Sequence, residues 1–177
     1  MGRGNVFLVG MMGAGKTTLG KALALRLKAD FFDTDKVLVE RTGVPVATIF
    51  EIEGEAGFRR RESGLLAELA ERDDCVVATG GGAVLSEENR TLMRNHGTVV
   101  YLRARIESLW ERTRHDSSRP LLATPDPRAT LAEILEQRDP LYREAAHLVV
   151  ETGAQSAGTL VSRVIAALRE SSSGAPA

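Results

Sequence analysis

The chain has 177 residues, which is near the usual size of one domain and enough to bury a full hydrophobic core. Hydrophobic residues make up 43% and charged residues 27%, and the net charge is −1, so no general attraction to nucleic acids or membranes is expected. No apolar run approaches the roughly 18 residues that a membrane-spanning helix requires.

The first residues and the cysteine content indicate a cytoplasmic protein. Residues 1–4 lead directly into the first apolar run, so we expect no signal peptide. Cys75 is the one cysteine in the sequence and cannot form an internal disulfide, which suits a reducing compartment. Because apolar residues follow it directly, we expect its side chain to fill space in the core.

A glycine-rich stretch near the start is the strongest motif. Residues 10–17 read Gly-Met-Met-Gly-Ala-Gly-Lys-Thr and match the P-loop pattern G-x-x-x-x-G-K-[ST] at every specified position. An apolar run at 6–9 predicts a buried strand before the motif. Leucines at every fourth position within 18–27 predict a helix with one apolar stripe after it. Strand, loop and helix in this order are the setting of a P-loop.

A P-loop binds the phosphates of a nucleotide. Its glycines let successive backbone N–H groups point toward phosphate oxygens, and the following helix adds the positive end of its dipole. Lys16 can bridge the outer phosphates, and the hydroxyl of Thr17 can bind Mg²⁺. A glycine-rich turn that binds nothing is the alternative, but such a turn does not require Lys-Thr directly after Gly15.

Five apolar runs alternate with amphipathic helical patterns, at 6–9, 29–32, 75–78, 99–102 and 148–150. This alternation is typical of an α/β fold with a parallel sheet covered by helices on both faces. Ligands of such folds bind at the carboxyl ends of the strands. The polar residues that follow each run are therefore candidates for a site.

The second run is followed by Asp33, Thr34 and Asp35. In an extended chain the two carboxylates would point to opposite sides, so one could hold Mg²⁺ through water while the other accepts a proton from a hydroxyl. Capping of a helix that the pattern predicts over 36–41 is the alternative, and from these residues alone it is the commoner role.

Three successive arginines at 59–61 lie on a helix that we expect to begin after Gly54 and to run to about residue 72. Successive residues on a helix point in different directions, so at most one or two arginines can face a cleft. There a guanidinium would bind a carboxylate through two parallel hydrogen bonds. The others would form a solvated charged face with Glu55 and Glu62.

The third run ends at Gly80, Gly81 and Gly82, which would let a ligand approach backbone N–H groups closely. A plain flexible loop is the alternative. Ser86 then predicts the N-cap of a helix that ends near residues 95–97.

Beyond the helix predicted at 106–114, residues 115–127 are polar and rich in proline, and we expect a mobile surface loop. It carries Arg119, which could close over the γ-phosphate, although an inert loop is also possible. A helix is predicted at 128–139, where Arg138 in the last turn would also suit the helix dipole. The last helix is expected at about 158–168.

Several blocks together resemble the shikimate kinase family over residues 5–168. They are the P-loop, then Phe-Asp-Thr-Asp, Ile-Phe, Gly-Glu-x-x-Phe-Arg, Gly-Gly-Gly-Ala, Arg-Pro-Leu-Leu and Arg-x-Pro-Leu-Tyr, in this order. The resemblance implies transfer of the γ-phosphoryl group of ATP to the 3-hydroxyl of shikimate, in chorismate and aromatic amino-acid synthesis. It implies a three-layer P-loop kinase fold with a five-stranded parallel sheet, similar to nucleoside monophosphate kinases.

The resemblance also implies one kinase domain over 1–170, with a substrate-binding region at about 33–62 and a mobile lid at about 113–127. We expect a disordered tail at 171–177, because this segment consists of Ser, Gly, Ala and Pro. The partners would be the small molecules ATP and shikimate, with neither nucleic acid nor membrane. We expect a monomer in the cytoplasm, with Mg²⁺ as its cofactor.

By family position, Asp35 would bind shikimate hydroxyls and act as the candidate base, with Lys16 and Arg119 as further catalytic residues. The resemblance assigns shikimate binding to Asp35, Arg59, Gly80, Gly81, Gly82 and Arg138. The two arginines of this set would bind the carboxylate, and Gly81 would donate its backbone N–H.

For the nucleotide, the resemblance assigns ATP binding to Gly13, Ala14, Gly15, Lys16, Thr17, Thr18, Arg112, Arg119 and Gln155. Arg112 would lie against adenine. Mg²⁺ would lie at Thr17 and Asp33, bound mainly through water. Many family members carry Arg or Asn followed by Pro in the adenine loop, where this chain has Gln-Ser-Ala at 155–157.

Three other functions stay open from the sequence. Another small-molecule kinase with this core could act on gluconate or a nucleoside monophosphate, although aromatic residues for base stacking are only 5% of the chain. A GTP-dependent switch would need an Asn-Lys-x-Asp guanine reader, which the sequence lacks. A degenerate nucleotide-binding protein would not need the intact set Lys16, Thr17, Asp33, Asp35 and Arg119.

Overall fold

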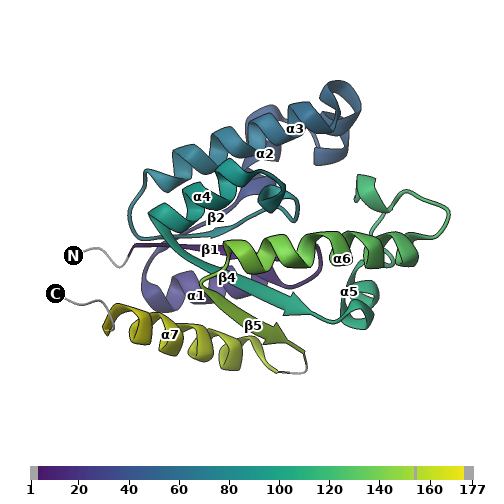
Figure 1. Ribbon diagram of the computed structural model, residues 1–177. Coiled ribbons are helices and arrows are strands. Elements are labelled where there is room, and N and C mark those ends of the chain that lie inside the picture. Colours follow the sequence, from purple (N-terminus) through teal and green to yellow (C-terminus); the bar gives the residue numbers. More distant parts are fainter. Residues whose placement is uncertain (1–3, 154, 174–177) are drawn as a thin grey trace.

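A computed structural model describes residues 4–153 and 155–173. Within this part of the chain, five parallel strands form one sheet in the order β2-β3-β1-β4-β5 (Figure 1). They are β1 (Asn5–Val9), β2 (Asp30–Asp33), β3 (Cys75–Ala78), β4 (Gly97–Ala104) and β5 (Leu148–Thr152). Leu8 of β1 lies opposite Ala78 on one side and Val100 on the other.

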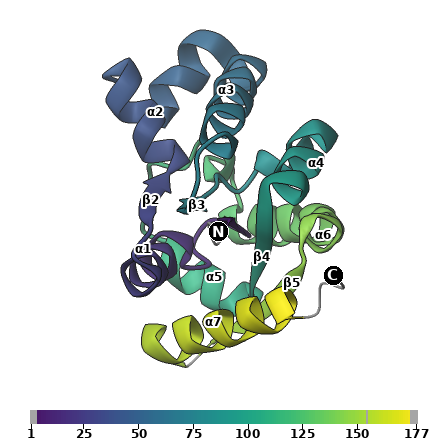
Figure 2. The same cartoon turned by 90° about the vertical axis from the view of Figure 1, so that its left-hand side faces the viewer.

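Helices cover both faces of the sheet, as the alternating pattern predicts. Figure 2 shows α1 (Lys16–Leu27) and α7 (Ala157–Ser173) on one face, with α3 (Val46–Ala70), α4 (Glu87–His96) and α6 (Pro127–Ala145) on the other. The remaining helical segments are α2 (Thr34–Thr42), α5 (Ile106–Thr113) and the 3₁₀ turns η1 (Ala83–Leu85) and η2 (Pro120–Leu122). The three-layer α/β kinase fold is therefore confirmed.

The central strands are buried on both faces, which explains their continuous apolar sequences. Every residue of β1 and β3 is buried, and Phe7, Leu8 and Val77 are fully inaccessible to solvent. Cys75 is buried at the start of β3, as expected for a space-filling side chain. This rigid sheet presents its carboxyl edge to the loops that carry the predicted motifs.

Helix α6 corrects one prediction, because it passes through Pro140 and ends only at Ala145. The sequence predicted its end at Asp139, since a proline inside a helix costs about 3 kcal/mol. Tertiary contacts offset that cost. Tyr142 and Ala145 are fully buried, and Arg94 donates to the carbonyl oxygen of Ala145 at 3.2 Å. Arg138 consequently lies inside the helix and not in its last turn.

The predicted break at Gly54 is present, with φ 71° and ψ 177° inside α3. This backbone conformation is accessible to glycine and strained for other residues. It separates a helical stretch at 46–53, which the sequence did not predict, from the predicted helix, which ends at Ala70 and not at Arg72.

The C-terminal end of α7 corrects the expectation of a disordered tail at 171–177. The helix continues to Ser173, and the hydroxyls of Ser171 and Ser172 donate to the carbonyl oxygens of Ala167 and Leu168. Each hydroxyl bonds to the carbonyl oxygen four residues earlier, a contact that serine side chains make within helices. Residues 174–177 lie outside the described residues.

Candidate active site

A cavity of about 690 Å³ opens at the carboxyl edge of the sheet, between the loop after β1, the start of α2, the middle of α3, the turn after β3 and the loop before η2. Most predicted site residues line it, namely Gly13, Gly15, Lys16, Thr17, Thr18, Asp33, Asp35, Arg59, Gly80, Gly81, Gly82, Arg119 and Arg138. Segments that are far apart in the sequence therefore meet in one cleft.

Three further residues of the predicted nucleotide site do not line this cavity. Ala14 is buried within the P-loop. Arg112 lies against the outer side of the loop and donates to the carbonyl oxygen of Gly13 at 2.9 Å. Gln155 is exposed in the connection between β5 and α7.

The P-loop has the backbone that its glycines permit. Gly13 and Gly15 have φ of 80° and 95°, in the left-handed region that favours glycine. A Cβ atom on Gly13 would also lie 2.8 Å from Cγ2 of Thr113, so the loop packs closely on α5. Helix α1 begins directly after Gly15, and its N-terminus faces the cavity where the phosphates of a nucleotide would lie.

Lys16 is 9% exposed, and its ammonium is held by the loop itself. Nζ donates to the carbonyl oxygens of Gly10 at 2.6 Å and Met11 at 2.9 Å. Burial lowers the pKa of Lys16 to about 8, against the opposing effect of the Asp35 carboxylate. The lysine ammonium thus lies beside the cleft and is partly desolvated. An anion would bind it strongly there, because little water screens the charge.

Asp33 caps a helix, which confirms one of the alternatives that the sequence left open, and it also contacts Thr17. Its Oδ1 accepts the backbone N–H of Lys36 at 3.2 Å and caps α2, while Oδ2 accepts the hydroxyl of Thr17 at 2.6 Å. The second contact joins β2 to the start of α1 and brings a hydroxyl and a carboxylate together. Such hard oxygen ligands fit Mg²⁺, which usually takes few protein ligands and completes its shell with phosphate and water.

Asp35 lies in the first turn of α2 and not in an extended segment, so its side chain turns into the cleft. Its Oδ1 is buried and has no hydrogen-bond partner among the described residues. Burial raises the pKa of Asp35, and the nearby Asp33 raises it further, while Lys16, Arg119 and Arg59 lower it. An unpartnered buried carboxylate oxygen is unfavourable by itself and is suited to accept a ligand hydroxyl.

Of the three arginines in α3, Arg59 lines the cleft, whereas Arg61 forms an exposed ion pair with Glu53 at 2.6 Å. Arg59 donates from Nη1 to Oε1 of Glu62 at 3.0 Å. Arg138 reaches the same region from α6 and is only 5% exposed. Together with Lys16 and Arg119, these guanidinium groups outnumber the three carboxylates that also line the cleft and offer cationic partners to an anionic ligand.

Glu62 is a site residue that the sequence analysis placed on the solvated face. Its side chain is 1% exposed, and Oε2 has no hydrogen-bond partner in the described part of the chain. Burial raises the pKa of Glu62, while Arg59 lowers it. A signal was available, because Glu62 falls on the apolar stripe of Phe58, Leu65 and Leu66. A carboxylate on that stripe must face the core or a cleft.

Hydrogen bonds hold the triple-glycine turn from several sides, in contrast to a plain flexible loop. The N–H of Gly80 donates to Oγ1 of Thr34 at 3.0 Å, and the hydroxyl of Tyr142 donates to the carbonyl oxygen of Gly81 at 2.6 Å. A Cβ atom on Gly80 would overlap the Glu62 carboxylate, and one on Gly82 would overlap the Arg59 guanidinium. A side chain at Gly80 or Gly82 would therefore displace one of these two cleft residues.

Arg119 lines the cavity from the loop between α5 and α6, next to Ser118 and η2. Its Nε donates to Oδ2 of Asp116 at 2.9 Å. Hydrogen bonds from Ser118 and from Arg119 lower the pKa of Asp116. The ionised Asp116 thus supports Arg119 in an orientation that adds a further cation to the phosphate side of the cleft.

A P-loop at the carboxyl edge of a five-stranded parallel sheet, facing a cationic pocket with an open carboxylate, defines a P-loop kinase that acts on a small molecule. The shikimate kinase family model matches residues 12–169. The chain therefore belongs to the shikimate kinase family, and it is an enzyme that phosphorylates shikimate with ATP.

The relatives that match this chain in sequence and in structure include several named as shikimate kinases. A shikimate kinase from Nitrosospira multiformis is 61% identical over 153 residues, which cover 86% of this chain and 78% of the relative. One from Chromobacterium violaceum is 54% identical over 95% of this chain and 91% of its own length. The structure of a shikimate kinase from Acinetobacter baumannii, solved in complex with shikimate, matches with a TM-score of 0.92 and 43% identity, covering 95% and 94% of the two chains.

Proposed function

We propose that the chain transfers the γ-phosphoryl group of ATP to the 3-hydroxyl of shikimate within the 690 Å³ cavity. The observation that carries this proposal is the convergence of Asp35, Arg59 and Arg138 in the cavity that Lys16 also lines. This arrangement suits an acceptor with hydroxyls and a carboxylate. The relative from Acinetobacter baumannii, solved with shikimate bound, supports the same acceptor for this chain.

The acceptor would be held at its two ends. Arg59 and Arg138 bind the carboxylate through planar guanidinium forks, and Glu62 keeps Arg59 in place through the 3.0 Å contact. Backbone groups of the triple-glycine turn lie against these arginines and contact the ring. Asp35 accepts a hydrogen bond from a ring hydroxyl through its open Oδ1.

The nucleotide would lie on the P-loop. Backbone N–H groups of residues 13–18 bind phosphate oxygens, and the Lys16 ammonium exchanges the carbonyls of Gly10 and Met11 for the outer phosphates. Arg119 neutralises charge on the transferred group. Arg112, which donates to the carbonyl oxygen of Gly13, would contact adenine, with Gln155 as the further candidate.

Mg²⁺ would be held by Thr17 and Asp33, whose oxygens already lie 2.6 Å apart. When bound, the ion would neutralise phosphate charge. Residues 4–153 and 155–173 contain no group of three His, Cys, Asp or Glu side chains placed to hold a metal. This agrees with an ion that takes its other ligands from phosphate and water.

Phosphoryl transfer needs positioning and charge neutralisation more than covalent chemistry. Asp35 orients the acceptor hydroxyl and receives its proton as the bond to phosphorus forms. Closure of the loop at about 113–127 would exclude water as a competing acceptor. We also expect a single kinase domain that acts as a monomer in the cytoplasm. Among the described helices, none is long and apolar enough to cross a membrane.

The test is ADP release by the purified chain with Mg²⁺ and ATP, using shikimate, gluconate or AMP as acceptor. We expect turnover with shikimate and none with gluconate or AMP. Turnover with gluconate or AMP in its place, or hydrolysis independent of all three, would contradict the proposal. Omission of Mg²⁺, with EDTA present, should abolish the activity.

A further inference from the structure

Tyr142 is a fully buried tyrosine that the proposed reaction does not use. It lies on α6 one turn after Arg138, and its hydroxyl donates to the carbonyl oxygen of Gly81 at 2.6 Å. The same hydroxyl lies 3.6 Å from Sδ of Met11 in the P-loop. Tyr142 therefore reaches the point where the acceptor turn and the nucleotide loop meet.

The carbonyl that Tyr142 holds belongs to the peptide between Gly81 and Gly82. Because a trans peptide is planar, fixing its oxygen also fixes the N–H of Gly82 on the opposite side. Gly82 lies against the Arg59 guanidinium, and a Cβ atom on Gly81 would lie 3.5 Å from Nη1 of Arg138. This peptide thus sits between the two arginines proposed to bind the acceptor carboxylate.

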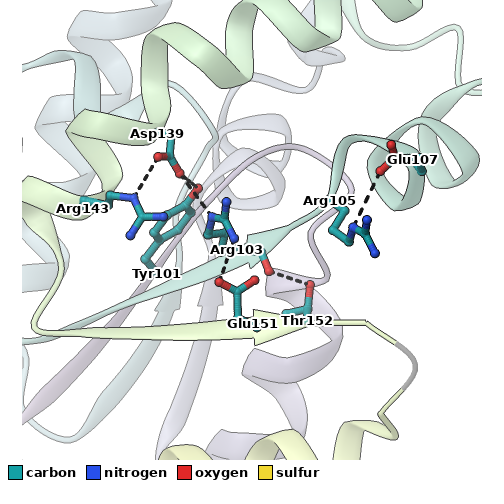
Figure 3. A network of polar contacts seen from close by, with 8 residues as sticks. All are labelled: Tyr101, Arg103, Arg105, Glu107, Asp139, Arg143, Glu151 and Thr152. Atoms are coloured by element: carbon teal, nitrogen blue, oxygen red, sulfur yellow. Dashed lines mark hydrogen bonds and ion pairs between the residues drawn. The ribbon is translucent and has the colours of Figure 1, made fainter.

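The tyrosine ring is itself firmly held. It stacks on Tyr101 of β4 with ring centroids 4.9 Å apart. The hydroxyl of Tyr101 donates to Asp139 at 2.7 Å, and Asp139 also accepts from Arg143 at 2.8 Å (Figure 3). The stacking of the two rings does not depend on the Tyr101 hydroxyl, and it holds Tyr142 next to Arg138 with its own hydroxyl directed toward Gly81.

We propose that Tyr142 is a positioning residue, which sets the Gly81–Gly82 peptide so that its backbone and the two arginines bind the acceptor carboxylate together. The inference rests on the proposed function. Two glycines in succession have wide conformational freedom, and the buried hydroxyl removes it. Burial raises the pKa of Tyr142 to about 12, so the hydroxyl remains a donor over the working pH range.

Tyr142→Phe tests the proposal, because it removes the hydroxyl and keeps the stacked ring. We expect KM for shikimate to rise about tenfold, as for one misaligned hydrogen bond to a charged group, with KM for ATP within twofold of wild type. Tyr101→Phe is the matched control, since it removes the other hydroxyl of the same stacked pair. It should leave both KM values within twofold.

An unchanged shikimate KM in Tyr142→Phe, or equal effects on shikimate and ATP, would overturn the positioning role. In a destabilised variant, the rise in melting temperature caused by added shikimate still reports acceptor binding. A rise as large as in wild type would also overturn it. Failure of the proposed function can be told apart from failure of the positioning role, because the wild-type chain would then show no shikimate-dependent ADP release.

Discussion

Lys16 and Asp35 carry opposite charges in the cleft, and burial shifts the pKa of each in the direction that favours its neutral form. The pKa of Lys16 falls to about 8 and that of Asp35 rises, each with desolvation as the main cause. Burying ionisable groups with such pKa shifts costs folding free energy, and such groups are typical of functional sites. A bound ligand would stabilise both charged forms, because a phosphate would replace the neutral carbonyl partners of Lys16 and a hydroxyl would donate to the open Oδ1 of Asp35.

Asp35→Asn should abolish turnover with the fold intact. An amide cannot accept the hydroxyl proton, so we expect kcat to fall by at least about a hundredfold. The thermal midpoint should not fall, because a neutral amide is less costly to bury than this carboxylate. ADP release and a circular dichroism melt provide the two readouts. A kcat near that of wild type would refute the role of Asp35.

Arg59→Lys should raise KM for shikimate by about tenfold and affect KM for ATP much less, because an ammonium cannot form the planar fork. Arg61→Lys is the control on the same helix, since Arg61 pairs with Glu53 at the surface. Initial rates with each substrate varied in turn give both constants. Equal changes in the two KM values would count against carboxylate binding by Arg59.

At the scale of elements, α3 shows how backbone geometry directs a functional side chain. The break at Gly54 starts a new helix whose first turns carry Phe58 into the core and Arg59 into the cleft. Gly64 lies ten residues further along, in the regular part of the same helix. Added Cβ atoms would meet nothing within 4 Å at either glycine, so substitutions there isolate the backbone effect.

Gly54→Ala and Gly64→Ala should therefore change stability in opposite directions. The first forces alanine into a conformation that costs about 1–3 kcal/mol, whereas the second removes a helix-interior glycine and gains about 0.5–1 kcal/mol. Urea unfolding with equal slopes for all three proteins gives the comparison. Stabilisation by Gly54→Ala would show that the break at residue 54 is not needed.

For the whole molecule, His147 links β4 to the segment that enters β5. Its ring Nδ1 accepts the backbone N–H of Val99 at 3.0 Å, and the backbone N–H of His147 donates to the carbonyl oxygen of Val99 at 2.8 Å. Burial lowers the pKa of His147, with a smaller effect of the Arg94 charge in the same direction. The folded chain therefore binds this proton less readily than the unfolded chain does.

This difference predicts a loss of unfolding free energy as the pH falls below about 6.5, the ordinary histidine pKa. His147→Asn should reduce that loss, since an amide oxygen can accept the Val99 N–H and does not titrate. Urea unfolding between about pH 7.5 and pH 5.5 tests this. Parallel pH profiles for wild type and His147→Asn would contradict it.

Local patterns were enough to predict the five strands, most of the helices, the P-loop, and Asp33, Asp35 and the glycine turn as candidate site residues at strand ends, although they missed the helical stretch at 46–53. These features depend on residues close in sequence. Parallel strands place their carboxyl ends at one edge, so the motifs could be expected to meet. The family resemblance added Arg138 and the choice of acceptor.

The features that depend on contacts between distant residues were decided by the tertiary structure. Helix α6 continues past Pro140 because buried Tyr142 and Ala145 hold its second half. Glu62 becomes part of the cleft because Arg59 and the packed glycine turn enclose it. Propensities act over a few residues, whereas burial sums contacts from the whole chain. Here burial outweighed a helix breaker and enclosed a carboxylate whose Oε2 has no hydrogen-bond partner among the described residues.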